Sequence, residues 1–173
     1  MAKEKILVLE KTSVVSNAIW FLALITIAII LPSFVHNQFI TGPIVNATLF
    51  LATFLIGARA AMLIGLVPSV IALSSGLLPV ALAPVVPFIM VSNAILILII
   101  DGLRKFNNIL VGFIASIGKY LFLYGSCYLI SNIIIQKTVA IKAIAMMMSW
   151  SQLVTALAGM VIALTVLKIM KKI

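Results

Sequence analysis

Lys119 is the residue whose position most clearly indicates chemistry. It lies in "ASIGKYLFLYGSCYLI", about ten residues into an apolar run over residues 109–134, or roughly 15 Å along a helix. A charged side chain at that depth in a membrane is costly unless it is paired or hydrated, so it usually marks a functional site. Asp101 is the one acid beyond the N-terminal segment, and it lies at a shallower level of the preceding run. Contact of Lys119 with a ligand, pairing with Asp101 and snorkelling all stay open.

Other polar and aromatic residues fall near the same level of neighbouring apolar runs. Asn93 in "MVSNAIL" lies at a similar depth, and Tyr124 follows Lys119 by about one helical turn. Trp150 and Gln152 open the last run in "MMSWSQL", where a tryptophan alone is also typical of an interfacial anchor. Apolar walls with a few convergent polar groups are the composition of a small-molecule pocket. We therefore predict a pocket that these side chains share with Lys119.

The stretch "FVHNQFITGPIVNAT", residues 34–48, concentrates side-chain hydrogen-bonding groups between two apolar runs. These groups include the only histidine of the chain and belong to His36, Asn37, Gln38, Thr41 and Asn46. An ordinary solvated loop is one interpretation. The other is a lid over the mouth of the pocket, with Gly42-Pro43 turning the chain into the next helix. We favour the lid.

The stretch "SSGLLPVALAPVVPF", residues 74–88, has three prolines in nine residues. Proline lacks an N–H and clashes with the preceding turn, so this stretch is not a regular helix. Irregular backbone at membrane depth occurs only where protein or a water-filled cavity covers it. We expect a structured cap on the same side as residues 34–48, so that two ordered loops enclose the pocket.

The elements that position these residues follow from composition. The chain of 173 residues is 65% hydrophobic and 9% charged, with a mean hydropathy of +1.37, so lipid must be its main solvent. A membrane span needs about 20 apolar residues. We predict an all-α membrane protein, a single domain with a six-transmembrane-helix bundle and a short charged segment over residues 1–15. The expected helices cover about 16–34, 43–57, 60–76, 84–103, 109–134 and 146–168.

The net charge of +9 follows membrane topology. In a six-span arrangement nine basic residues fall on one side, namely Lys3, Lys5, Lys11, Arg59, Arg104, Lys105, Lys168, Lys171 and Lys172. Only Lys137 and Lys142 fall on the other side. This asymmetry places both termini in the cytoplasm. The basic residues then set orientation and contact anionic membrane lipid, and we predict no nucleic-acid partner.

Small residues recur at intervals of four at Gly57, Ala61, Gly65 and Ser69, which puts them on one helix face. Such a face lets helix backbones approach closely in lipid. Internal helix packing is the favoured interpretation, and docking of a partner protein is the alternative.

Catalytic groups are scarce. With one histidine and no acid in the predicted outer half, the sequence offers neither an acid–base pair nor an HExxH-type metal site. Cys127 is the only cysteine, so no disulfide within the chain and no thiolate metal cluster is expected. We predict a binding protein with no cofactor and no catalytic residues.

The layout resembles the substrate-binding S component of energy-coupling-factor (ECF) vitamin transporters. The resemblance is most specific over residues 40–96, "ITGPIVNATLFLATFLIGARAAMLIGLVPSVIALSSGLLPVALAPVVPFIMVSNAIL". It implies an ABC-type importer in the cytoplasmic membrane of a prokaryotic cell. The S component captures a vitamin-like micronutrient from outside and delivers it by toppling against a coupling subunit, which two cytoplasmic ATPases drive. By position, the resemblance implies caps at residues 36–41 and 77–84 and a wall that includes Asn93, Lys119, Tyr124, Trp150 and Gln152.

Family members often dock through an Ala-x-x-x-Ala motif in the first span. Here Ala18, Ala23 and Ala28 are five apart and share no face, which puts docking through that span in doubt. Lys119 favours a small, partly apolar substrate with an acidic or carbonyl group. The alternative from another class is a non-transporting six-helix scaffold of cell-shape machinery, similar to the rod-shape protein D family.

Overall fold

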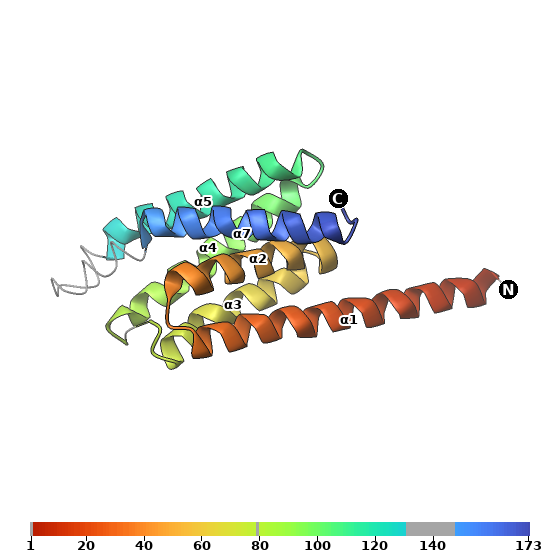
Figure 1. Cartoon of the computed structure of the whole chain (residues 1–173), viewed down its shortest axis with the longest axis horizontal. Helices are drawn as coiled ribbons and strands as arrows, with labels where there is room; N and C mark the ends of the chain where they lie inside the picture. The colour runs from red at the N-terminus through yellow and green to blue at the C-terminus, as the bar shows by residue number, and fades with distance from the viewer. Residues whose placement is uncertain (1, 79, 131–147) are drawn as a thin grey trace.

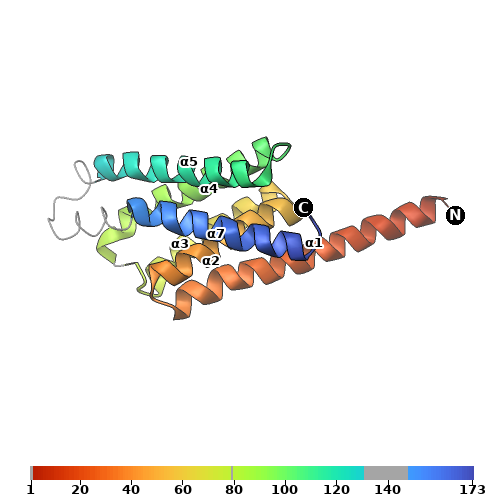
Figure 2. The ribbon, with the colours of Figure 1, turned by 45° about the horizontal axis from the view of Figure 1, so that its top comes forward.

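The computed structural model describes residues 2–78, 80–130 and 148–173. These residues form six α-helices and one 3-10 helix, with no strand among them. The elements are α1 (Ala2–Phe34), α2 (Gln38–Ile56), α3 (Ala58–Ser74), η1 (Val80–Val85), α4 (Val86–Leu103), α5 (Asn108–Leu129) and α7 (Trp150–Ile169). Successive helices run in alternating directions along the long axis, and both termini lie at the same end (Figure 1). The first half of α1 projects beyond the bundle at that end (Figure 2).

Five of the described helices are long and apolar enough to cross a membrane. They contain the spans Val14–Phe34, Gln38–Ile56, Leu82–Leu103, Asn108–Cys127 and Trp150–Ile169. The apolar helix α3 is shorter, with 17 residues. These features are those of a multi-pass helical membrane protein. The count of six spans and the cytoplasmic side of the termini stay predictions.

The helix boundaries differ from the sequence-based ones mainly in α2, which begins at Gln38 rather than at about residue 43. Asn37 caps it, since its side chain accepts a hydrogen bond from the Phe39 N–H at 2.9 Å. Gly42 and Pro43 therefore lie inside the helix and make no turn into it. A Cβ on Gly42 would lie 2.9 Å from Thr155 Cγ2, so this glycine lets α2 approach α7.

Two other boundaries differ at the ends of the predicted runs. The charged start of the chain continues α1 without a break from Ala2, instead of forming a separate segment over residues 1–15. The predicted runs 109–134 and 146–168 extend partly into residues 131–147, which lie outside the described residues together with Lys137 and Lys142.

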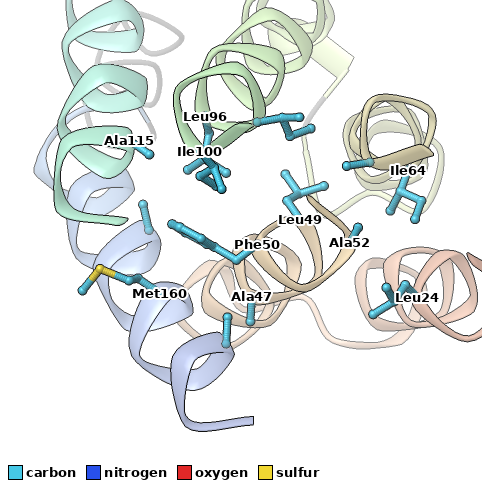
Figure 3. Close-up of a cluster of buried hydrophobic side chains, with 14 of the residues drawn as sticks. Leu24, Ala47, Leu49, Phe50, Ala52, Ile64, Leu96, Ile100, Ala115 and Met160 are labelled. Carbon is cyan, nitrogen blue, oxygen red and sulfur yellow. The ribbon is translucent and has the colours of Figure 1, made fainter. Parts of the chain in front are cut away.

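The main hydrophobic core surrounds α2, which contacts α1, α3, α4 and α7. Phe50 and Leu49 point from α2 toward α4 and α7 on one side and α3 on the other (Figure 3). Close approach of α7 depends on Gly159, where a Cβ would lie 2.6 Å from Asn46 Cβ and 2.7 Å from the Pro43 carbonyl oxygen. The core thus fixes the rotation of α2 relative to α7, and with it the direction of Asn46.

A second cluster covers the end of the bundle opposite the termini. Leu78, Leu82 and Val85 are buried there together with Leu123 of α5. The proline-rich segment therefore folds over the helices, with residues 80–85 as a 3-10 helix. Gly76 takes a φ of 82°, in the left-handed region, where the chain leaves α3.

The stripe of small residues faces the interior of the bundle over most of its length. Ala61 is fully buried, and a Cβ on Gly65 would lie within 3.5 Å of side chains from both α2 and α4. Gly57 lies just before α3 with a φ of 89° and joins α2 to α3. Internal packing is thus the role of Ala61 and Gly65.

Candidate functional site

Lys119 is the centre of the site. Its side chain is only 3% exposed, and Nζ donates hydrogen bonds to Asn46 Oδ1 at 2.6 Å and to Asn93 Oδ1 at 2.7 Å. These contacts join α5 to α2 and α4. Asp101 instead forms an ion pair with Arg104 at 3.3 Å on the same helix end. The interpretation in which Lys119 pairs with Asp101 is therefore wrong.

Both carboxamides that hold Lys119 are themselves fixed by backbone carbonyls. Asn46 Nδ2 donates to the Gly42 carbonyl oxygen at 2.9 Å, and Asn93 Nδ2 donates to the Gly65 carbonyl oxygen of α3 at 2.9 Å. Because each amide nitrogen has its own acceptor, each amide oxygen is left to face the lysine. The network therefore connects α2, α3, α4 and α5 through buried polar groups, which makes the position of Nζ well defined.

A cavity of about 100 Å³ opens beside this network. Most of its lining comes from the first half of α2, the second half of α3 and the first half of α4. These parts of the helices lie at the end of the bundle opposite the termini (Figure 1). A volume of that size holds several water molecules or one small organic group. Its lining is Pro32, Gln38, Thr41, Gly42, Val45, Asn46, Pro68, Ser69, Ala72, Leu77, Leu78, Ile89, Asn93, Lys119 and Gln152.

Six of the ten predicted substrate-binding residues line the cavity. They are Gln38, Thr41, Asn46, Asn93, Lys119 and Gln152. Thr41 donates its hydroxyl to the Val35 carbonyl oxygen at 2.8 Å, which ties α2 to the end of α1. In the sequence, the six residues fall in a predicted loop or in separate apolar runs. The arrangement of the helices brings them to one cavity.

The other four predicted residues lie outside the lining. His36 Nε2 contacts the Ser75 carbonyl oxygen at 2.9 Å, and Asn37 caps α2. Tyr124 is 60% exposed and packs against Tyr120 with ring centroids 5.8 Å apart. Trp150 is 61% exposed, and its ring centroid lies 6.0 Å from the ring centroid of Phe39.

The placement of Tyr124 follows from helix geometry. Residues three or four apart share a helix face, whereas Tyr124 is five positions after Lys119 and points to a different side. Leu123, four positions after Lys119, is the buried residue. The prediction considered only the distance along the helix. The direction in which a side chain points also depends on its angle around the helix axis, and that angle turns Tyr124 away from the cavity.

Ser69 is a lining residue that sequence reasoning assigned to helix packing. It is 4% exposed, and its Oγ is the buried side-chain polar atom without a hydrogen-bond partner in the described part of the chain. The spacing of four from Gly65 placed it correctly on the inward face of α3. Its position in the second half of α3, close to the predicted cap over residues 74–88, was the signal for a pocket role.

The charge inside the cavity is one-sided. The chain has three acids, Glu4, Glu10 and Asp101, and none belongs to the lining. The lining thus combines one lysine, several neutral hydrogen-bonding groups and apolar walls. Such a site favours a negatively charged or carbonyl group over a cation.

Fold and site together define a helical membrane protein with a small polar cavity at one end of its bundle. The chain matches no protein-family model, no curated protein and no solved structure.

Proposed function

We propose that the chain is the substrate-binding subunit of a membrane importer of the ECF type. It captures a small, partly apolar, vitamin-like molecule from the side opposite its termini. The observation that carries the proposal is the buried Lys119, held by two fixed carboxamides beside a cavity at that end. An intramembrane lysine placed this way is costly to a purely structural bundle.

The distribution of polar groups supports capture from one side. The cavity lies toward one end, whereas Phe50, Ile100 and Leu167 are buried in the half that carries the termini. A channel would need polar groups along the whole path. A binding subunit needs them only where the substrate enters and rests, and release then requires a movement relative to a partner.

The sequence also supports a need for partners. It contains no G-x-x-x-x-G-K-[ST] motif, which is the phosphate-binding loop of transport ATPases. Energy for uptake therefore comes from other chains, which we propose are a coupling subunit and two cytoplasmic ATPases. The nine basic residues on the side of the termini would place that side of the chain in the cytoplasm of a prokaryotic cell, where these partners would dock.

The proposal is tested by gentle purification of the tagged chain from its native cells. We expect a membrane coupling protein and two ATPases to copurify, and native mass spectrometry to detect a retained small molecule. The Lys119→Ala variant should lose that molecule while it stays folded in detergent. Copurification of cell-wall enzymes without ATPases would instead establish the scaffold function.

A further inference from the structure

The cavity contains hydrogen-bond donors that the protein leaves unused. A lysine ammonium has three N–H donors. Two of them are accounted for by Asn46 Oδ1 and Asn93 Oδ1, and the described residues provide no third acceptor. Both acceptors are neutral dipoles, and no carboxylate lies among the described residues that line the cavity. The third N–H donor of the ammonium form is thus available beside the cavity, without an acid to pair with it.

Ser69 provides a second unused donor for a reason that the structure makes explicit. Helical Ser and Thr hydroxyls commonly bond the carbonyl four residues earlier. Thr48, Thr53 and Ser116 do so, to the carbonyl oxygens of Ile44, Leu49 and Gly112. The matching acceptor for Ser69 is the Gly65 carbonyl oxygen, which already accepts a hydrogen bond from Asn93 Nδ2 at 2.9 Å.

Asn93 therefore has two effects on the site. Its oxygen positions Lys119, and its nitrogen takes the acceptor that would otherwise hold the Ser69 hydroxyl. The hydroxyl is left buried, without a partner among the described residues, in the lining of the cavity. A buried polar group without a partner is costly, so a bound molecule that accepts its hydrogen bond gains affinity.

The remaining lining limits the size and character of that molecule. Pro32, Val45, Pro68, Ala72 and Ile89 provide apolar walls in a cavity of about 100 Å³. A single lysine balances a single negative charge, whereas a phosphate dianion would leave a buried excess charge. From these observations we infer that the substrate is a small monocarboxylate, bound through its carboxylate by Lys119 and Ser69 with its apolar body against the prolines.

This inference deepens the proposed function, because it names the chemical class of the captured molecule. It is tested with three probes of nearly equal shape, namely benzoate, benzamide and benzylammonium. Each is titrated by calorimetry into the purified full-length protein in detergent. We expect benzoate to bind, benzamide to bind at least tenfold more weakly, and benzylammonium to give no signal.

Two serine variants separate recognition from general packing. Ser69→Ala should weaken benzoate about tenfold, with a smaller effect on benzamide, because a hydrogen bond to a charged acceptor is the stronger kind. Ser116→Ala is the matched control, since Ser116 is equally buried in α5 but bonds its own helix and lies outside the lining. It should leave both affinities unchanged. Lys119→Met should abolish the preference for benzoate.

Several results would overturn the inference. They are no benzoate binding up to its solubility limit, equal binding of benzamide, preferred binding of benzylammonium, or equal effects of Ser69→Ala and Ser116→Ala. Displacement of benzoate by an equal concentration of chloride would identify a site for inorganic anions instead. Selective benzoate binding by a chain that copurifies with no transport partner would retain the carboxylate site and refute the transporter. Uptake of a neutral or cationic molecule would instead retain the proposed transport function and refute the carboxylate site.

Discussion

Lys119 Nζ lies 2.6 Å from Asn46 Oδ1, although the two residues are 73 positions apart and belong to α5 and α2. The acceptor is a neutral carboxamide, and its nitrogen donates a hydrogen bond to the Gly42 carbonyl oxygen. The lysine is therefore held in position by neutral acceptors, without a carboxylate partner among the described residues.

Asn46→Asp should neutralise Lys119 within the protein. A carboxylate at this position would pair with Nζ, so we expect loss of benzoate binding by more than tenfold. The free energy of unfolding should fall by about 1–3 kcal/mol, because the buried ion pair gains roughly what its desolvation costs while the hydrogen bond from Asn46 Nδ2 to the Gly42 carbonyl oxygen is lost. Calorimetric titration and thermal unfolding measure the two effects. Asn108→Asp, at the other end of the bundle, is the control, and unchanged benzoate binding in Asn46→Asp would contradict the role of Lys119.

Asn93→Ala should destabilise the fold and weaken binding together. It removes the contacts with Lys119 and with the Gly65 carbonyl, so we expect a loss of about 2–4 kcal/mol in the free energy of unfolding. The freed carbonyl can then accept the Ser69 hydroxyl, which removes a donor from the cavity. Ser92→Ala is the neighbouring control, because Ser92 is buried but bonds its own helix. Equal stability of the two variants in thermal unfolding would contradict the prediction.

Gly159→Ala should force α7 away from α2. The new methyl group would meet the Pro43 carbonyl oxygen at 2.7 Å and the Ala47 nitrogen at 2.8 Å, and backbone atoms cannot rotate aside. We expect a loss of about 1–3 kcal/mol, larger than the gain in helix propensity. Gly125→Ala in α5 meets nothing within 4 Å and should be neutral or more stable. Comparison of the unfolding midpoints in detergent checks both variants, and the reverse order would show that α2 and α7 are not packed this closely.

Ser75→Ala should speed ligand release. Ser75 Oγ donates to the Pro32 carbonyl oxygen at 2.9 Å and thereby connects the end of α3 to the end of α1 beside the cavity. Loss of one such hydrogen bond should raise the release rate of benzoate about two- to tenfold. The rate at which the protein releases radiolabelled benzoate after rapid dilution provides the measurement. Ser74→Ala, which removes only a bond within α3, should leave the rate unchanged.

Labelling of single cysteines should establish which side of the membrane the cavity faces. In a Cys127→Ala background, Ser74→Cys should react with an impermeant maleimide in intact cells. Ser74 is exposed and is the last residue of α3, which ends on the side of the bundle opposite the termini. Lys105→Cys, exposed between α4 and α5, should react only after permeabilisation. The opposite pattern would invert the predicted orientation.

The sequence by itself determined the helical class, the apolar character of the helices and the positions of the important residues along them. Its apolar runs correspond to helices, and the position of Lys119 and Asn93 within their runs indicated a polar site inside the bundle. These properties depend on residue type and on distance along a helix, which a linear pattern records. The same pattern favoured a polar cavity on the side opposite the basic residues, where the structure has one.

Only the tertiary structure decided which side chains meet. It connected Lys119 to two carboxamides, freed the Ser69 hydroxyl by occupying the Gly65 carbonyl, and turned Tyr124 outward. It also extended α2 back to Gln38, which moved Thr41 and Gly42 from a supposed loop into a packed helix. The physical reason is that rotation of each helix about its axis is set by close contacts such as Gly159 on Asn46, and those contacts join residues far apart in the chain.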